Sequence, residues 1–424
     1  MLSQKLNERL TRVGPGTPAG NLLRRYWFPI AAVSEMSNAA TKLIKLLGTP
    51  LVLFKDGQGK LGLIGAYCAH RRANLVYGMV EEDGIRCPYH GWKFDHVGRC
   101  LEQPFEQTVH PDGKLRDRAR IPGYPVEALG GLIFAYLGPE PVPLLPRWDV
   151  LVQDGVWHEI GCTVTHCNWL QGMENVLDPV HVEWLHGEFT RYSASQAGYG
   201  RQPDRVRHER IRFEPFEHGI MKRRLLKGES EDCDDWTTGH PMIFPTMQKG
   251  LDMLRVRVPV DDTHTAQWYY ITRPSPDGQS QAPEDIPLFE MPSPALDERG
   301  QPQWRLLNED VDPQDNAIFA SQEPILDRTL EILGESDRGI VLYRRMLREQ
   351  IKIVERGGDP MNVFRDPAQN VSLSLDTESA AGFLNGRVAF AIGNKRATFS
   401  SKYRSLLEPV EPEPTRPEEK TLAG

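Results

Sequence analysis

The sequence predicts an α+β protein with two main domains: an all-β domain, followed by a domain that combines an antiparallel sheet with helices. Three observations support this. Between residues 40 and 147, short apolar runs alternate with turn sequences such as KDGQGK and EEDG. From residue 148 onward, strand-like runs mix with stretches of helical apolar spacing. The proline-rich PEPVPLLPRW between these regions is typical of a linker.

Composition limits the function classes. The 424 residues suffice for two domains, and 39% hydrophobic with 25% charged residues is ordinary for a globular protein. A net charge of −8 argues against nucleic-acid binding, which needs a basic face. The N-terminus lacks the apolar region of a secretory signal, and the longest apolar run is too short to span a bilayer. We therefore expect a cytoplasmic protein with no membrane partner, whose six cysteines are thiols or ligands.

The elements are expected in the following order. Residues 1–39 contain NLLRRYWFPIAAV, which has helical apolar spacing. The preceding GPGTPAG favours a capped turn over a phosphate loop, because no buried strand leads into it. Strands of the first domain are expected at KLIKLLG, PLVLFKD, LGLIGAYCAH, GIRCPYHGW and GGLIFAYLG.

The second domain has its own strands and helices. Strands are expected at RVRHERIRFEPF, MIFPTM, MLRVRVPV and TAQWYYITR. Helices are expected in CNWLQGMENVLDPVHVEWLHG, QDNAIFASQEPILDRTLEILG and GIVLYRRMLREQIKIVERG. Residues 405–424 are rich in proline and glutamate, which predicts a disordered tail.

Two loops of the first domain carry possible metal ligands. Each supplies one cysteine and one histidine: Cys68 with His70, and Cys87 with His90, with sixteen residues between the two pairs. Structural zinc accepts two cysteines and two histidines, but it usually pairs cysteine with cysteine in one loop and histidine with histidine in the other. A [2Fe–2S] cluster in which two histidines replace two cysteines on one iron needs the mixed supply seen here.

A second set of possible ligands lies in ENVLDPVHVEWLHG. Asp178 is a good helix N-cap, so His181 and His186 could be incidental residues of a short helix that Gly187 ends. Their five-residue spacing does not align side chains on a regular α-helix; a π-bulge, or a place for His186 in the last turn, would correct this. These residues alone leave both interpretations open. HEIGCTVTHC (His158, Cys162, His166, Cys167) is interpreted as a strand, and Cys100 and Cys233 as simple thiols.

Both motifs resemble those of one enzyme family. CAHR…CPYHGW resembles the Rieske signature, and Asn175, Asp178, His181 and His186 match the N-x2-D-x2-H-x4-H motif of Rieske non-haem iron oxygenases. LTRVGPGTPAGNLLRRYWFPIAA, KLLGTPLVLFKD, DWTTGHPMIFP and SQEPILDRTLEILGESDRGIVLYRRML resemble the phthalate dioxygenase-like branch, which includes aryl-ether O-demethylases. The resemblance covers almost the whole chain.

The resemblance implies a specific organisation. A Rieske [2Fe–2S] domain would span 40–147 and a helix-grip, START-like catalytic domain 148–404, with 1–39 packed on the latter. The cluster would be held by Cys68, His70, Cys87 and His90. A mononuclear Fe(II) would be held by His181, His186 and a carboxylate chosen from Glu309, Asp310, Asp312 and Asp315; we expect Asp315. Asp178 would carry electrons from His90 of a neighbouring subunit to His181, which implies a homotrimer or stacked trimers.

The implied function is that of a terminal oxygenase. Without a flavin, nicotinamide or plant-type ferredoxin motif, the chain would need a separate NAD(P)H-dependent reductase. We expect oxidation of an aromatic carboxylate, by cis-dihydroxylation of a phthalate- or benzoate-type ring. The alternatives are O-demethylation of a methoxylated lignin-derived aromatic and, more remotely, a non-catalytic electron carrier.

An anionic substrate would need a buried cation, best supplied by arginine. The candidates are Arg205, Arg207, Arg210, Arg212, Arg223 and Arg224. The alternative is that these arginines lie on solvated strand faces or on a surface that docks the electron donor.

Overall fold

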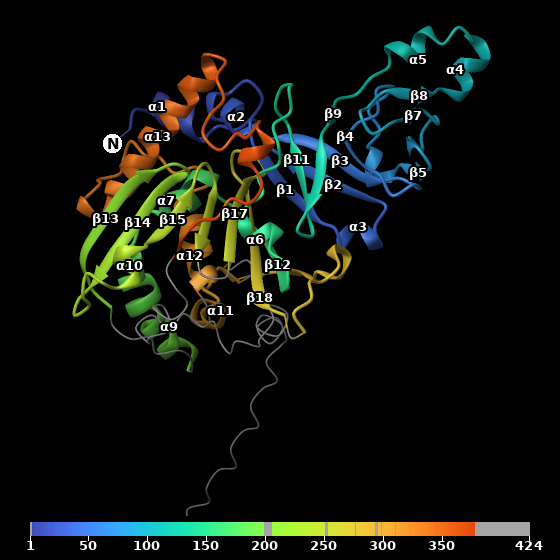
Figure 1. Ribbon diagram of the computed structural model, residues 1–424. Helices are drawn as coiled ribbons and strands as arrows, with labels where there is room; N and C mark the ends of the chain where they lie inside the picture. The colour runs from blue at the N-terminus through green and yellow to red at the C-terminus, as the bar shows by residue number, and fades with distance from the viewer. Residues whose placement is uncertain are drawn as a thin grey trace, which may run out of the picture.

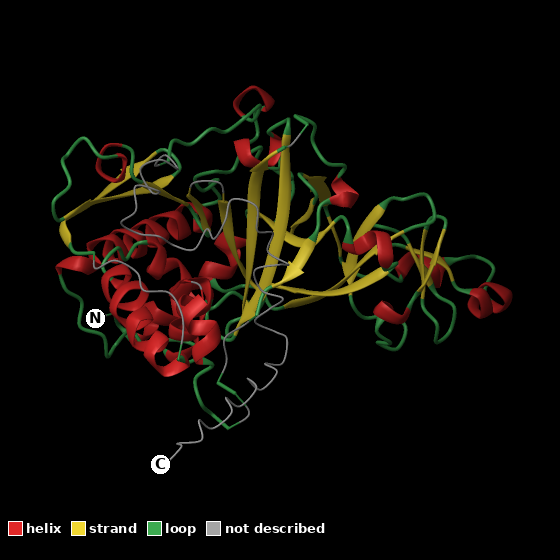
Figure 2. Ribbon diagram, turned by 90° about the horizontal axis from the view of Figure 1, so that it is seen from below, coloured by secondary structure: helices red, strands yellow, loops and turns green. Residues whose placement is uncertain are grey.

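The computed structural model describes residues 2–198, 206–250, 253–275, 277–292, 296–297, 299–309 and 311–377. These form an elongated molecule, with a small β-rich end joined to a larger body of one long sheet and several helices (Figures 1 and 2). No helix in these ranges is long and apolar enough to cross a membrane. The predicted tail, residues 405–424, lies outside them.

Two four-stranded antiparallel sheets build the small end. One has the order β2 (Thr41–Leu46), β3 (Thr49–Lys55), β4 (Leu61–Gly65) and β9 (Gly123–Tyr124). The other has the order β5 (Met79–Glu81), β6 (Gly84–Arg86), β7 (Lys93–Phe94) and β8 (Cys100–Glu102). Their apolar faces share a core that includes Phe54, Ile64 and Phe94. The short helices α4 (Pro104–Val109) and α5 (Lys114–Arg118) project beyond this core (Figure 1).

A three-stranded sheet joins the two ends. β11 (Leu132–Tyr136) lies between β1 (Trp27–Ala32) and β10 (Val126–Leu129). The helix expected over NLLRRYWFPIAAV is therefore wrong beyond α2 (Pro18–Leu23): WFPIAA is a strand. Its side chains are all buried, and pairing with β11 satisfies the backbone of this aromatic-rich run better than an isolated helix could.

The larger body is organised around an eight-stranded sheet that is antiparallel except where β19 joins β12. Its strands in spatial order are β13 (His208–Phe216), β14 (Gly219–Leu226), β15 (His240–Ile243), β16 (Met247–Gly250), β17 (Met253–Pro259), β18 (Thr265–Pro274), β12 (Val156–Thr165) and β19 (Leu288–Glu290). Three of the four strands expected from the sequence are present as β13, β17 and β18. The strand expected at MIFPTM is wrong, because residues 244–246 form the turn between β15 and β16.

The described helices lie around these sheets. The main ones are α1 (Gln4–Thr11), α7 (Trp169–Val176), α8 (His181–Glu183), α9 (Phe189–Ala197), α11 (Trp304–Glu309), α12 (Val311–Ser321) and α13 (Arg338–Glu355). The shorter ones are α3 (Glu35–Asn38), α6 (Asp149–Val152), α10 (Asp234–Thr237), η1 (Leu75–Tyr77), η3 (Pro283–Asp285), η4 (Glu335–Asp337) and η5 (Pro367–Gln369). Of these, α7, α10, α12 and α13 contact strands of the eight-stranded sheet. The helix expected over QDNAIFASQEPILDRTLEILG is wrong beyond Ser321, because Glu323 adopts a positive φ of 74° before Pro324.

A buried ionic network holds α7 in place. Glu174 accepts hydrogen bonds from Arg328 (Nε to Oε1, 2.9 Å) and from Arg344 of α13 (Nε to Oε1, 2.6 Å). Arg328 also donates to Asn7 of α1 (3.2 Å). The charges in this network are mutually paired, so α7 is fixed to α1 and α13 in one position.

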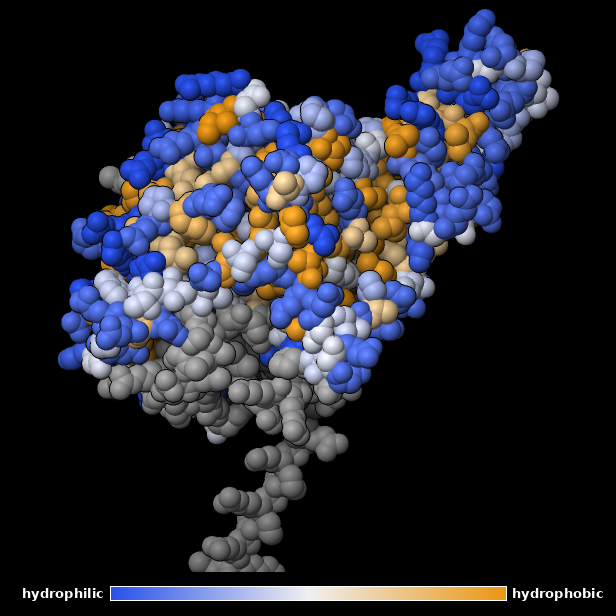
Figure 3. All heavy atoms as spheres, in the orientation of Figure 1, coloured by the Kyte–Doolittle hydropathy of each residue, from blue (hydrophilic) through white to orange (hydrophobic). Residues whose placement is uncertain are grey.

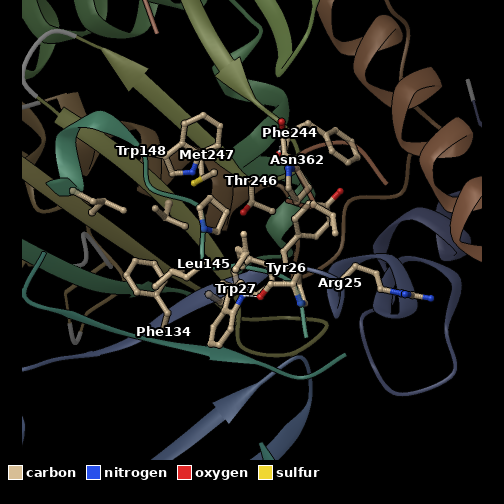
Figure 4. Close-up of a pocket in the computed structure, with 18 of the residues that line it drawn as sticks. Arg25, Tyr26, Trp27, Phe134, Leu145, Trp148, Phe244, Thr246, Met247 and Asn362 are labelled. Carbon is tan, nitrogen blue, oxygen red and sulfur yellow. Dashed lines mark hydrogen bonds between the residues drawn. The ribbon is translucent and has the colours of Figure 1, made fainter. Parts of the chain in front are cut away.

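The junction between the two ends is apolar. In the view of Figure 3 the surface is mainly hydrophilic, and apolar residues gather in the middle, where the small end meets the body. Beneath it lies a cavity of about 40 Å³, whose lining includes Trp27, Phe134, Trp148, Leu254 and Val256 (Figure 4). Leu254 and Val256 point from β17 into this cavity, so their strand neighbours Arg255 and Arg257 face the opposite side of the sheet.

Candidate metal centres

The two loops that carry the cysteine–histidine pairs have the same backbone design. In each, the carbonyl of the cysteine accepts a hydrogen bond from the amide four residues later: Cys68 from Arg72 and Cys87 from Gly91, both at 3.0 Å. The donor residue has a positive φ in both loops, 64° for Arg72 and 75° for Gly91. The strained Arg72 shows that the fold imposes this turn even where glycine is absent.

The four side chains are brought together in like pairs. Cys68 and Cys87 are buried beside each other; burial, foremost, and the neighbouring Cys87 raise the pKa of Cys68 to about 11. The rings of His70 and His90 are 4.4 Å apart, and His70 also stacks on Trp92 at 4.6 Å. Nδ1 of His70 is buried without a hydrogen-bond partner, as expected of an atom that awaits a metal.

This arrangement fits a two-iron cluster better than one zinc ion. The four ligand atoms of a tetrahedral zinc site lie within about 4 Å of one another. Across the described ranges, the single group of three or more histidine, cysteine or acidic ligand atoms within 4.8 Å of one another is His181, His186 and Asp315. The cysteine–cysteine and histidine–histidine pairs are instead what a [2Fe–2S] cluster requires, with sulfur on one iron and nitrogen on the other.

A π-helical turn aligns the two histidines of the second site. Oδ1 of Asp178 accepts hydrogen bonds from the amides of Val180 (2.9 Å) and His181 (3.3 Å), so Asp178 caps the turn that leads into α8, whose own N-cap is Val180. After α8, the π-helix η2 (Trp184–Glu188) adds the extra residue per turn that the five-residue spacing requires. The π-bulge alternative is thereby confirmed. The alternative that places His186 in a last turn is wrong, because the helix continues through Gly187 into α9.

Helix α12 supplies the carboxylate. Oδ1 of Asp315 is 3.2 Å from Nε2 of His186 and 3.7 Å from Nε2 of His181. Asn175 of α7 directs Nδ2 at both Asp315 Oδ1 and His181 Nε2, each at 3.4 Å. Two imidazoles and one carboxylate converging on one point form a 2-His-1-carboxylate site, which suits Fe(II) with open coordination positions.

Asp315 lies in the second turn of α12, which begins at Val311, and not at the helix start that the sequence suggested. Burial would raise the pKa of this carboxyl, but His186 and His181 lower it to about 2. The group is therefore an anion at neutral pH, as a metal ligand must be.

The other acids near residue 310 have different positions. Asp312 forms an ion pair with Arg255 of β17 at 2.9 Å. Glu309 is the last residue of α11. Asp310 lies outside the described residues.

A contact that the sequence did not reveal orients His186. Nδ1 of His186 is 2.8 Å from Oε1 of the fully buried Gln314. Nε2 of Gln314 donates to Thr190 (2.8 Å) and to the carbonyl of Leu307 (2.5 Å), so the amide oxygen is left to accept the imidazole N–H. The sequence offered one indication of this contact, since Gln314 directly precedes the expected ligand Asp315.

The second carboxylate oxygen of Asp178, Oδ2, faces the His181 ring. Oδ2 is 3.6 Å from Nδ1 of His181, and the side chain of Asp178 remains 27% exposed. Burial would raise the pKa of Asp178, but the neighbouring His181 ring and the amides of Val180 and His181 outweigh that effect and lower it. An ionised carboxylate that contacts a possible ligand and also reaches the surface could connect this site to a group on another molecule.

The remaining cysteines are free thiols, of which Cys100 and Cys167 are buried and Cys162 and Cys233 are partly buried. HEIGCTVTHC lies on β12 and the turn after it, as expected. Burial raises the pKa of Cys162 and Cys167 to about 12 and that of Cys100 to about 11. Burial also raises the pKa of Cys233. None is a thiolate at neutral pH, which agrees with the simple-thiol interpretation.

The arginines suggested as substrate anchors have carboxylate partners. Arg207 pairs with Glu183 and Glu188, Arg210 with Glu231, Arg212 and Arg223 with Glu214, and Arg224 with Asp235. Arg205 lies outside the described residues. These ion pairs favour a structural role for the five arginines that are described.

Comparisons with known proteins agree with both centres. Residues 26–124 match the family model of the Rieske [2Fe-2S] domain. The 5,5'-dehydrodivanillate O-demethylase oxygenase subunit of Sphingobium sp. (strain NBRC 103272 / SYK-6) is 41% identical over 390 residues, which are 92% of this chain and 90% of that protein. Phenoxybenzoate dioxygenase subunit alpha of Ectopseudomonas oleovorans is 34% identical, over 85% of this chain and 88% of that protein.

The fold has solved counterparts. The structure of Pseudomonas putida CBB5 NdmA covers 80% of this chain and 93% of its own, with a TM-score of 0.58 at 21% identity.

Proposed function

The chain belongs to the α subunits of the Rieske non-haem iron oxygenases, and from this premise we propose that it removes the methyl group of a methoxylated aromatic acid. It is a terminal oxygenase component, whose cofactors are a Rieske [2Fe–2S] cluster and a mononuclear non-haem iron, and it takes electrons from a reductase or ferredoxin partner. The cytoplasmic location stays a prediction.

The observation that carries the reaction class is the convergence of His181, His186 and Asp315 on one point. We infer that these residues hold the iron, and that Cys68, His70, Cys87 and His90 hold the cluster. The domain division at 40–147 and 148–404 belongs to the same proposal. The choice of O-demethylation rests on the greater identity to the dehydrodivanillate O-demethylase subunit than to the phenoxybenzoate dioxygenase subunit.

When bound, the iron supplies the capacity to reduce O₂ next to the substrate. The chain's own residues prepare the site. Gln314 holds the His186 ring through Nδ1, so that Nε2 points at the centre. Asn175 spans His181 and Asp315 and fixes their separation. The side chains of His181, His186 and Asp315 are largely shielded from solvent, which limits the access of water to the reacting atoms.

The overall reaction balances as a monooxygenation. A methoxyarene, O₂, two electrons and two protons give the hemiacetal and water, and the hemiacetal breaks its C–O bond to release formaldehyde and the phenol. The two electrons come from the partner protein. Formaldehyde production therefore distinguishes O-demethylation from ring attack.

We propose that Asp178 passes electrons between copies of the chain. The cysteine–histidine loops belong to the small end, whereas α7 and α12, which frame the His181–Asp315 site, belong to the body (Figure 1). The partly exposed Asp178 contacts His181, whereas His90 is exposed on the small end. A ring of three copies that joins His90 of one chain to Asp178 of the next would shorten the electron path.

A panel of methoxybenzoates, phthalates and chlorobenzoates tests the proposal with the reconstituted enzyme, its reductase and NAD(P)H. We expect formaldehyde in equal amount to phenol from a methoxybenzoate. The second candidate is cis-dihydroxylation of a benzoate-type ring, which is supported by the phenoxybenzoate dioxygenase relative. A dihydrodiol without formaldehyde would favour that candidate.

A further inference from the structure

Four arginines are buried within the described residues: Arg224, Arg257, Arg328 and Arg344. Three of them donate to carboxylates. Arg224 bonds to Asp235 at 2.7 Å, Arg328 to Glu174 at 2.7 Å, and Arg344 to Glu174 at 2.6 Å. Arg257 is only 4% exposed, yet its Nε and Nη1 are buried with no hydrogen-bond partner. Arg257 therefore differs from the other three: Asp315 and Asp312 attract its charge, but no carboxylate accepts a hydrogen bond from its Nε or Nη1.

Arg257 lies beside the candidate iron site. It is on the face of β17 that is turned away from the cavity of Figure 4, towards α7 and α12. A Cβ on Gly172 of α7 would stand 3.1 Å from Cδ and Nε of Arg257, and 3.8 Å from the ring of Phe319 of α12. The Arg257 side chain therefore passes between these two helices.

Helices α7 and α12, which lie on either side of the Arg257 side chain, also carry residues of the metal site. Asn175 is three residues after Gly172, and Asp315 is four residues before Phe319. One helical turn, about 5–6 Å along the axis, therefore separates Arg257 from the level of His181, His186 and Asp315. An aromatic ring with a reacting substituent on one side and a carboxylate on another spans a similar distance.

The same face of the sheet carries apolar side chains beside Arg255 and Arg257. Tyr269 and Ile271 of β18 form a buried cluster with Met291. Arg255 lies next to Tyr269 in the register and is already engaged by Asp312. Arg257 follows two residues later on β17, so one face of the sheet carries an apolar cluster and, next to it, a cation whose Nε and Nη1 have no hydrogen-bond acceptor.

We propose that Arg257 binds the carboxylate of the aromatic substrate, which makes it a specificity-determining residue. The guanidinium presents donors in a planar fork that fits a carboxylate. In the absence of such an anion, two buried N–H groups of Arg257 lack acceptors, which is a cost that a bound carboxylate would remove. This inference rests on the proposed oxidation of an aromatic acid and assigns the group that recognises it.

Equilibrium binding to the iron-loaded enzyme under anaerobic conditions tests the assignment. The probes are 3-methoxybenzoate and its uncharged methyl ester, and the readout is the ratio of their dissociation constants by calorimetry. We expect the wild type to bind the acid at least about tenfold more tightly than the ester. Arg257→Met should weaken acid binding about 10- to 100-fold and change ester binding less than about twofold, while Arg257→Lys should retain part of the preference.

Arg224→Met is the matched control, because it removes an equally buried arginine from the same sheet, but one that has a carboxylate partner. It should lower the melting temperature and leave the acid-to-ester ratio unchanged. Arg257→Met should lower the melting temperature less than Arg224→Met, since it breaks no hydrogen bond to a carboxylate. Gly172→Ala, which crowds the guanidinium, should reduce the acid preference without loss of iron.

Equal weakening of acid and ester in Arg257→Met, or a wild type that does not prefer the acid, would overturn the assignment. So would a drop in melting temperature as large as that of Arg224→Met, because it would show a structural role. Formaldehyde assays separate this failure from that of the proposed function. If the wild-type enzyme demethylates the ester as well as the acid, O-demethylation is supported and the role of Arg257 in carboxylate recognition is rejected. If no methoxyarene yields formaldehyde, the proposed O-demethylation is rejected. The acid-to-ester binding ratio still tests whether Arg257 recognises a carboxylate.

Discussion

Replacement of Gln314 by methionine should weaken iron binding at His186 without removing any ligand. Methionine has a similar size but cannot accept the His186 Nδ1–H, which now meets Oε1 of Gln314 at 2.8 Å. The imidazole then loses the contact that selects its tautomer and raises its basicity. Loss of such a partner typically lowers metal affinity about 10- to 100-fold, which is about 1.4–2.7 kcal/mol.

The same substitution also affects folding. Gln314 donates to Thr190 and to the carbonyl of Leu307, and both bonds are buried. At about 1 kcal/mol for each bond, and more where an acceptor is left unsatisfied, the free energy of unfolding should fall by about 2–4 kcal/mol. Iron loss must therefore be separated from general destabilisation.

Gln171→Met provides that separation. Gln171 is equally buried and makes three hydrogen bonds, to Phe319, Glu323 and Leu326, but contacts none of the three candidate ligands. Competition with a coloured Fe(II) chelator gives the affinity of the mononuclear site, and the visible absorbance of the cluster serves as an internal reference. We expect iron loss in Gln314→Met, retention in Gln171→Met, and near-normal affinity in Gln314→Glu, which keeps the acceptor. Equal iron affinity in the two methionine variants would refute the reasoning.

Three further predictions follow from the same geometry. Asp178→Asn should keep both metals bound and reduce turnover by at least about tenfold, measured as NADH-dependent product formation; normal turnover would remove the electron bridge. A fully loaded chain should contain three irons and show a rhombic EPR signal on reduction, whereas two irons would indicate a pure electron carrier and zinc would exclude the cluster. Burial lowers the pKa of His158 to about 4, below the value of about 6.5 in the unfolded chain. The unfolded chain therefore takes up the proton first as the pH falls. The free energy of unfolding should decrease between pH 6.5 and 4, by at most about 3 kcal/mol. In His158→Phe, which keeps the stacking on Tyr270, urea unfolding should lose this part of the pH dependence; an unchanged slope would contradict the assignment.

Local patterns predicted much of the fold correctly. Strands β13, β17 and β18 and helix α13 have strong periodicity, and they form where the apolar spacing places them, whereas MIFPTM contains the turn between β15 and β16. WFPIAA was misassigned because its spacing is compatible with a helix, and only the distant partner β11 makes it a strand. The end of α12 was misplaced because an apolar run continues past Pro324, whereas the backbone turns away at Glu323.

The sequence by itself determined which residues are chemically able to hold metals and how they are grouped along the chain. Cys68 with His70, Cys87 with His90, and His181 with His186 are each close in sequence, so short loops or one helical turn set their spacing. Only the tertiary structure selected Asp315 among four acids, matched Gln314 to His186, and left Nε and Nη1 of Arg257 without a hydrogen-bond acceptor. Those relations join α12 and β17 to helices more than 80 residues away in sequence, and long-range packing, which no local pattern encodes, decides which side chains meet.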